Sequence, residues 1–119
     1  NKKIIICDRF IDSTLAYQVY GSNVNKRLVD HVHKLILSKI KPDLTIVLKV
    51  NLKKAAQRVQ LRKFKNRYDK LSYKFYDKVQ KSFIKIAKKN KKKYKIFDNS
   101  TNTTNLEKNI LNLILKRIK

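Results

Sequence analysis

Apolar residues occur in three short runs along the chain, and each run predicts a β-strand. These runs are residues 3–7 (KIIIC), 44–50 (LTIVLKV) and 94–97 (YKIF). Each is too short for a helix, and the first two are rich in β-branched residues, which favour strands. We expect residues 3–7 and 44–50 to be fully buried, as the strands of a parallel sheet usually are.

The segments between these runs carry apolar residues at helical spacing. The clearest apolar stripe lies in residues 25–40 and consists of Leu28, Val32, Leu35, Ile36 and Ile40. Lys41-Pro42-Asp43 is expected to end that helix, because the residue before a proline disfavours helical backbone. Further helices are predicted at residues 11–20, 52–64, 72–89 and from Thr104, where Thr104 and Glu107 match a capping box.

Strands that alternate with helices in this way predict an α/β fold with a parallel sheet and right-handed crossovers. The 119 residues contain no internal repeat and no linker, so residues 1–119 are predicted to form a single domain. In such sheets ligands bind beyond the carboxyl ends of the strands. That rule places Asp8, Arg9 and the loop after residues 94–97 at the functional edge.

The chain is strongly basic, with 31 Lys+Arg against 8 Asp+Glu and a formal net charge of +23. A polyanion partner such as nucleic acid is one interpretation. Biased codon usage is the other, because Lys, Asn and Ile are residues of A/T-rich codons. Lysine alternates here with core residues along helices rather than with aromatics and glycines, so we favour codon bias and expect no nucleic-acid partner.

Several residues are predicted to have only structural roles. The lone cysteine, Cys7, excludes an intrachain disulfide, fits a cytoplasmic protein and is expected to be a core thiol. His31 and His33 lie two residues apart on a helix, so they point to different faces and cannot form a paired metal site. No apolar run reaches the roughly 20 residues of a membrane span, and the lysine-rich run at 88–95 is expected to be a solvated helix end.

The segment CDRFIDSTLAYQVYG, residues 7–21, carries the candidate chemistry. Arg9, at the end of a predicted strand, could bind phosphate or carboxylate with both arms of its guanidinium, and Asp8 could orient it or lie near a metal. An Asp–Arg pair that merely caps the next helix is the alternative. The helix itself carries side chains that could contact a base edge or form an apolar wall, namely Ser13, Thr14, Tyr17 and Gln18.

This segment, together with KPDLTIVLKV (41–50) and QRVQLRKFKNRYDKLSYKFYDKVQKSF (57–83), closely resembles bacterial thymidylate kinase over essentially the whole chain. The most specific match is to the pattern DR-[FYH]-x-x-S-[ST]-x-A-Y-Q. The resemblance implies a P-loop kinase fold of the nucleoside monophosphate kinase type. It also implies transfer of the γ-phosphoryl group of ATP to dTMP, with Mg²⁺, by a cytoplasmic enzyme that is normally a homodimer.

The resemblance also implies roles for residues on the dTMP side. Arg9 matches the arginine that holds the dTMP phosphate, and Asp8 its acidic neighbour near the phosphates and the metal. Tyr17 matches the ring under the deoxyribose, where a 2′-hydroxyl would clash. The positions that contact the thymine edge, or lie beside it, are Ser13, Thr14 and Gln18.

On the ATP side, the resemblance implies a lid at about residues 58–70. Arg58, Arg62 and Arg67 match the basic helix and lid that close over ATP, and Arg62 and Arg67 join Arg9 as the expected catalytic arginines. Residues 66–69, which include Tyr68 as an expected substrate contact, match the family's D-R-[IY]-E stretch, with Asn66 in place of the acid. The loop at Asn99 and Ser100 resembles the one that lies against adenine.

The family's phosphate loop, G-x-x-x-x-G-K-[ST], is absent, because the chain contains a single glycine. Its first strand, expected between residues 4–7 and 44–50, is absent too. The resemblance therefore implies the carboxyl-terminal part of a thymidylate kinase, inactive by itself. Another nucleoside monophosphate or deoxynucleoside kinase and a basic RNA- or ribosome-associated domain are the alternatives, although Thr14, Tyr17 and Gln18 together fit thymine better than a purine.

Overall fold

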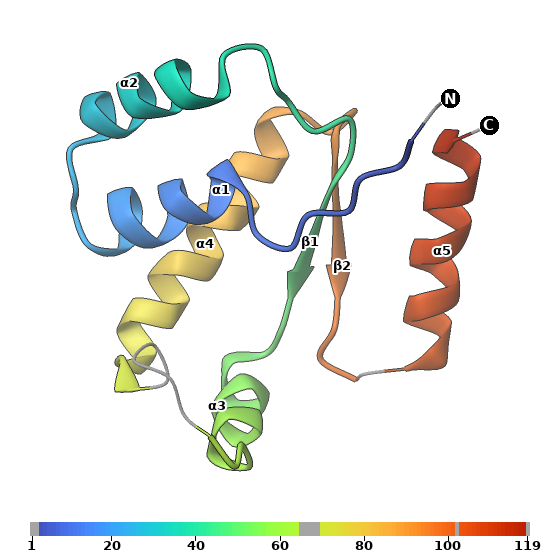
Figure 1. The fold of residues 1–119 in the computed structure, drawn as a ribbon. Coiled ribbons are helices and arrows are strands. Elements are labelled where there is room, and N and C mark those ends of the chain that lie inside the picture. The colour runs from blue at the N-terminus through green and yellow to red at the C-terminus, as the bar shows by residue number, and fades with distance from the viewer. Residues whose placement is uncertain (1–2, 65–69, 102, 119) are drawn as a thin grey trace.

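The computed structural model describes residues 3–64, 70–101 and 103–118. Two strands, β1 (Thr45–Lys49) and β2 (Tyr94–Asp98), pair in parallel, with Thr45 opposite Tyr94 and Lys49 opposite Asp98 (Figure 1). The helical elements are α1 (Ile11–Thr14), the π-helix η1 (Leu15–Gly21), α2 (Lys26–Leu37), α3 (Leu52–Gln60), α4 (Tyr73–Lys89) and α5 (Thr104–Ile118). The predicted α/β fold is thus confirmed, and so are the later two of the three predicted strands.

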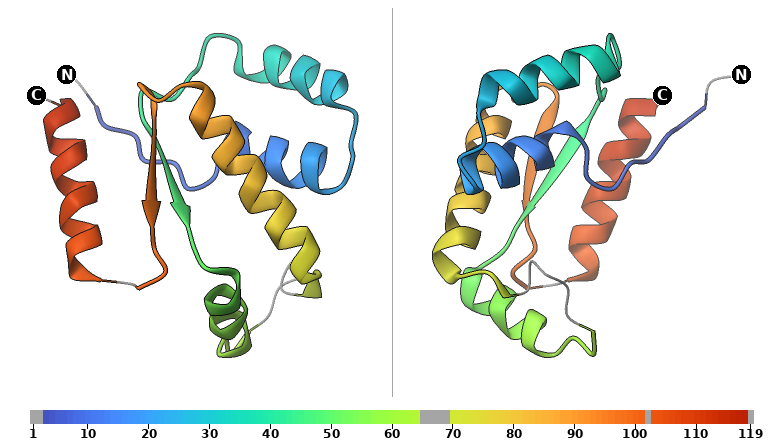
Figure 2. Two further views of the ribbon diagram at one scale, coloured as in Figure 1. Left: turned by 180° about the vertical axis from the view of Figure 1, so that it is seen from behind. Right: turned by 60° about the vertical axis from the view of Figure 1, so that its left-hand side comes forward.

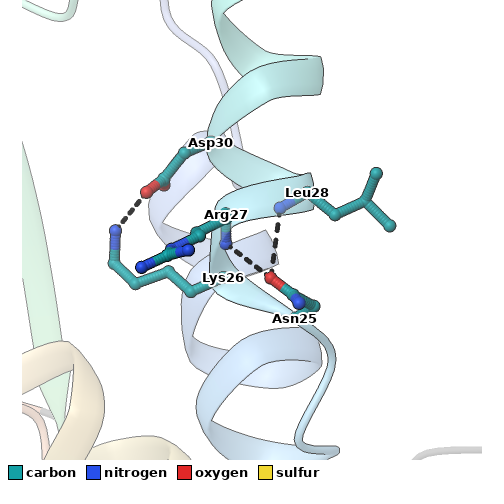
Figure 3. Close-up of polar contacts among 5 residues, drawn as sticks. All are labelled: Asn25, Lys26, Arg27, Leu28 and Asp30. Atoms are coloured by element: carbon teal, nitrogen blue, oxygen red, sulfur yellow. Dashed lines mark hydrogen bonds and ion pairs between the residues drawn. The ribbon is translucent and has the colours of Figure 1, made fainter.

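The second of the predicted helices begins at an asparagine cap. The side chain of Asn25 accepts a hydrogen bond of 2.9 Å from the backbone N–H of Arg27 and a second from that of Leu28 (Figure 3). Lys26 and Asp30 form an ion pair one turn further along. The two hydrogen bonds to Asn25 satisfy amide groups that the first turn of a helix leaves unpaired.

Asn51 and Ser72 cap α3 and α4 in the same way. At the other end of α2, Ser38 has a φ of 46° and ends the helix before Pro42, earlier than the hydrophobic pattern predicts.

The two strands lie between α4 on one side and α5 on the other, and α1 and η1 pack on the α4 side (Figure 2). Among the residues that the structure describes, the buried hydrophobic ones are all small: Ala16, Val19, Val29, Val47, Val79 and Ala87. The core therefore lies mainly where η1 and α4 meet β1. In the part of the chain described by the structure, no helix is both long and apolar enough to span a membrane.

The predicted first strand is wrong. Residues 3–7 form no strand, and the side chains of Ile4, Ile5 and Ile6 are 61%, 88% and 88% exposed. Cys7 is exposed as well, so the expected core thiol is also wrong. A strand needs a neighbour for its backbone groups, and within the described residues the sheet contains only β1 and β2, which pair with each other.

Full burial of residues 44–50 is wrong too. Leu48 of β1 is 49% exposed, because the described helices cover the small sheet incompletely. The apolar stripe of α2 also faces solvent, and Leu35 and Ile36 are 71% and 72% exposed.

The residues predicted to have only structural roles are mostly at the surface. His31 is exposed and His33 is half-buried, and the described residues contain no group of three or more His, Cys, Asp or Glu placed to hold a metal. The lysines of the run at 88–95 are exposed except for Lys93, but only part of this run is a helix end, because α4 ends at Lys89 and β2 begins at Tyr94.

Candidate functional site

Arg9 and Tyr17 lie in contact at the start of the first helix. The Arg9 guanidinium carbon is 5.3 Å from the centroid of the Tyr17 ring, which is the geometry of a cation–π contact. Arg9 has a φ of 60°, a left-handed conformation that costs a non-glycine residue energy and is found more often at functional sites. Asp8 and Arg9 are both exposed, so they are accessible to a ligand.

The helix that follows Arg9 changes from α to π at Leu15. Ser22 donates its backbone N–H to the carbonyl of Tyr17, five residues back, at 3.0 Å. Short π-helical turns of this kind occur frequently at functional sites. The helix was predicted from sequence but its π character was not. The predicted base- and sugar-contacting residues on α1 and η1 are all half-buried, namely Ser13, Thr14, Tyr17 and Gln18.

Tyr17 also belongs to an aromatic cluster with α4. Its ring centroid lies 6.1 Å from that of Phe75 and 6.2 Å from that of Phe83, in tilted and edge-to-face arrangements. Such arrangements are the favourable ones for aromatic pairs. Tyr17 and side chains from β1, α3 and α4 line a cavity of about 190 Å³ whose surface is mainly apolar. The ring therefore forms part of an apolar wall, as predicted.

Gly21 is the single glycine of the chain, and its neighbours explain why it is small. A Cβ at this position would lie 2.9 Å from ring atoms of Phe75 and 3.2 Å from the carbonyl oxygen of Ala16. A side chain here would therefore clash with the Phe75 ring unless that ring moved. In the sequence, Gly21 is recognisable only as the last residue of the motif. The contact that requires a glycine is made with Phe75 on α4, which is distant in sequence.

We expect Gly21→Ala to lower the free energy of unfolding by about 1–2 kcal/mol, because overpacking exceeds the helix preference of alanine. Chemical denaturation measures the change. In the control, the same substitution in a Phe75→Leu background should cost much less, since the clashing ring atoms are gone. An equal cost in both backgrounds would contradict this explanation.

Arg58 links α3 to the loop after β2. Its guanidinium donates a hydrogen bond of 2.8 Å to the backbone carbonyl of Asn99, and the backbone N–H of Asn99 donates to the carbonyl of Lys49, also at 2.8 Å. The structure thus brings together two residues predicted on the ATP side. Part of the Arg58 fork is already engaged by the protein, so Arg58 holds this loop in place.

Ser100 is held next to it at the carboxyl ends of the strands. Its hydroxyl oxygen accepts from the backbone N–H of Asn51 at 2.8 Å, and its own backbone N–H donates to Asp98 at 2.8 Å. The hydrogen bonds from Ser100, together with the Lys49 ammonium 3.3 Å away, lower the pKa of Asp98 to about 2. The three predicted ATP-side residues Arg58, Asn99 and Ser100 therefore form one cluster at the edge that the topology rule indicated.

Of the remaining predicted lid residues, the structure describes Arg62 but not Arg67 or Tyr68. Arg62 is exposed and follows the end of α3. Arg67 and Tyr68, like the rest of residues 65–69, lie outside the described residues, so their roles stay predictions.

Sequence reasoning missed one buried polar contact. The Tyr94 hydroxyl donates a hydrogen bond of 2.9 Å to the Asp12 carboxylate, and Asp12 is only 7% exposed. Burial raises the pKa of Asp12, although the hydrogen bond from Tyr94 opposes that rise. Burial and the bond to Asp12 raise the pKa of Tyr94 to about 12. No local pattern signals this pair, because its members are 82 residues apart.

Several known proteins to which this chain is similar are thymidylate kinases. A thymidylate kinase from Wolbachia pipientis wMel is 48% identical over 85 residues, which are 71% of this chain and 41% of that protein. One from Mycoplasma capricolum is 35% identical over 118 residues, which are 98% of this chain and 55% of that protein. The chain thus spans about half the length of the curated relatives it matches.

The fold and the family agree with these similarities. The crystal structure of thymidylate kinase from Ehrlichia chaffeensis matches with a TM-score of 0.64 and 28% identity, over 96% of this chain and 52% of that one. The architecture is therefore part of a P-loop nucleoside monophosphate kinase fold. The family model described as thymidylate kinase matches residues 1–110, and on this basis the chain belongs to the thymidylate kinase family.

Proposed function

We propose that this chain forms the dTMP-binding and lid part of an ATP:dTMP phosphotransferase that produces dTDP. The observation that carries the proposal is the Arg9 guanidinium held against the Tyr17 ring, at the start of the helix that bears Thr14 and Gln18. A bidentate anion clamp suits a phosphate, a ring beside it suits a sugar, and hydroxyl and amide groups suit a base edge. A nucleoside monophosphate presents these three parts in sequence.

The cluster of Arg58, Asn99 and Ser100 supports binding of ATP on the other side of the site. Phosphoryl transfer needs mainly positioning and neutralisation of charge, which arginines supply. In this proposal Arg9, Arg62 and Arg67 stabilise the transferring group, and Tyr68 contacts the substrate. The chain needs no general base, because the phosphate of dTMP is already a nucleophilic dianion.

Mg²⁺ is the proposed metal, and Asp8 suits it as a nearby carboxylate. Magnesium in phosphoryl-transfer sites is bound through one or two carboxylates together with substrate phosphates, and it keeps several waters. A single exposed acid near Arg9 is compatible with that mode. The ion would neutralise charge on the phosphates of ATP.

We also propose a cytoplasmic homodimer with nucleotides rather than nucleic acid as its ligands. The exposed apolar stripe on α2, which includes Leu28, Leu35 and Ile36, supports an interface between copies of this chain. Contiguous exposed apolar surface on a helix is typical of protein–protein contacts.

The direct test measures nucleotide binding and turnover in the polypeptide as the cell produces it, with any residues encoded before Asn1. We expect dTMP to bind more tightly than dGMP or dAMP, and dTDP to form from dTMP and Mg-ATP. Tight RNA binding without affinity for dTMP would instead support the RNA-associated alternative. Preference for a purine monophosphate would support a different nucleotide kinase.

Tyr17→Ala is expected to relax discrimination against ribonucleotides, because the ring excludes a 2′-hydroxyl only by its bulk. The relative kcat/KM for dUMP and UMP measures this effect, since both acceptors lack the thymine methyl. Phe83→Leu is the matched control, because it disturbs the same aromatic cluster but keeps the Tyr17 ring. If Tyr17→Ala leaves the ratio unchanged, or Phe83→Leu shifts it equally, Tyr17 only packs.

A further inference from the structure

Asp12 is unusual among the buried residues of the described chain. It and Ser82 are the buried polar side chains, and Ser82 merely donates to the carbonyl of Lys78 in its own helix. Asp12 instead contacts Tyr94 on another element, 82 residues away. Burying a carboxyl group costs free energy unless it is hydrogen-bonded, so the Tyr94 hydroxyl is needed to keep Asp12 inside.

The hydrogen bond joins the two elements that carry the opposite sides of the proposed site. Asp12 lies on α1, which continues into η1 and the dTMP-side residues. Tyr94 begins β2, whose other end leads to Asn99 and Ser100. The Asp12–Tyr94 hydrogen bond therefore connects α1 directly to β2, the strand that leads to Asn99 and Ser100.

The Asp12–Tyr94 hydrogen bond restricts the rotation of the α1–η1 helix more than the surrounding apolar packing does. Ala16 and Val19 of η1 are buried, and η1 packs against α4, but apolar contacts are non-directional and allow a helix to rotate or slide. A hydrogen bond has a preferred distance and angle. Asp12 lies little more than one turn before Tyr17, so fixing its direction also fixes the direction in which the later residues of the helix point.

We propose that Asp12 and Tyr94 are positioning residues, whose hydrogen bond sets the rotation of the α1–η1 helix and so aligns its dTMP-contacting side chains. The inference rests on the proposed function, because it assigns those side chains to dTMP. Asp12 and Tyr94 themselves do not contact the nucleotide. They act through Thr14, Tyr17 and Gln18.

The test compares Tyr94→Phe, which removes only the hydroxyl, with Tyr73→Phe, which removes one from an exposed ring on α4. In the polypeptide as the cell produces it, Tyr94→Phe should raise the dissociation constant of dTMP roughly fivefold, the effect of one lost hydrogen bond. That of ATP should change less than twofold, and Tyr73→Phe should change neither. Asp12→Asn keeps an acceptor oxygen and should bind dTMP better than Asp12→Ala.

Amide hydrogen exchange provides a readout that needs no nucleotide. Tyr94→Phe should increase exchange in residues 13–21 but leave α5 unchanged. A lower melting temperature with unchanged dTMP affinity and unchanged exchange in residues 13–21 would overturn the inference, because the pair would then only stabilise the fold. If the unmodified protein fails to bind dTMP, the proposed function fails, and the exchange data still decide whether the pair orients the helix.

Discussion

In the polypeptide as the cell produces it, Arg9→Lys is expected to reduce kcat/KM for dTMP by roughly 30- to 900-fold. That range corresponds to about 2–4 kcal/mol of lost transition-state stabilisation, the usual effect of removing one oriented donor group from a phosphate or oxyanion site. The charge is conserved, but the ammonium group is a point charge and cannot donate two parallel hydrogen bonds to phosphate. Lysine also lacks the planar group that lies on the Tyr17 ring.

Arg27→Lys is the matched control, because Arg27 is exposed on the first turn of α2, outside the proposed site. Its kcat/KM should stay within about twofold of the unmodified protein, as is typical of surface substitutions. Single-turnover measurements should show that binding of ATP is little affected by Arg9→Lys. A fall in kcat/KM of less than about threefold would show that Arg9 does not clamp the dTMP phosphate.

The elements that local sequence determines were predictable. Helix starts at Asn25 and Ser72 follow from side chains that cap their own first turn, and those caps are present. The runs at 44–50 and 94–97 contain β1 and β2, which form because each strand has the other as a parallel neighbour. Residues 3–7 have an equally apolar sequence but form no strand, because strand formation depends on a partner that hydrophobic pattern alone does not reveal.

In the candidate site, too, contacts between residues close in sequence were predictable and contacts between distant residues were not. Arg9 and Tyr17 lie within one motif, so the resemblance identified them and the structure places them in contact. The bond from Arg58 to the carbonyl of Asn99 was not predictable, because every residue has a carbonyl and sequence does not show which one is accessible. The Asp12–Tyr94 pair was missed for a related reason: two unremarkable residues meet only through the fold.

The 119-residue chain expressed by itself is expected to show no phosphoryl transfer. A glycine-rich phosphate loop requires several glycines, and the chain has only Gly21. ATP would meet Arg58 of α3 and the exposed Arg62 that follows it, but no cradle of backbone N–H groups. Its binding should therefore be weak and should fall steeply with added salt, because exposed charges account for most of it.

The same chain is expected to unfold over a broad temperature range and to aggregate. Within the described residues the sheet has two strands, the buried hydrophobic side chains are all Ala or Val, and Ile5, Ile6 and the α2 stripe are exposed. Open strand edges invite pairing between molecules, and a net charge of +23 adds self-repulsion within each one.

Thermal unfolding followed with and without dTMP and Mg-ATP tests both expectations. The control is a polypeptide in which a segment carrying a phosphate loop has been joined before residue 1, which should melt sharply and gain stability from each nucleotide by mass action. A sharp, cooperative transition of the 119 residues alone, accompanied by dTDP formation, would contradict the argument. It would mean that two strands and a core of small residues are enough to hold Arg9, Arg58 and Asn99 in their functional positions. It would also mean that the arginines alone can do the work of the phosphate loop.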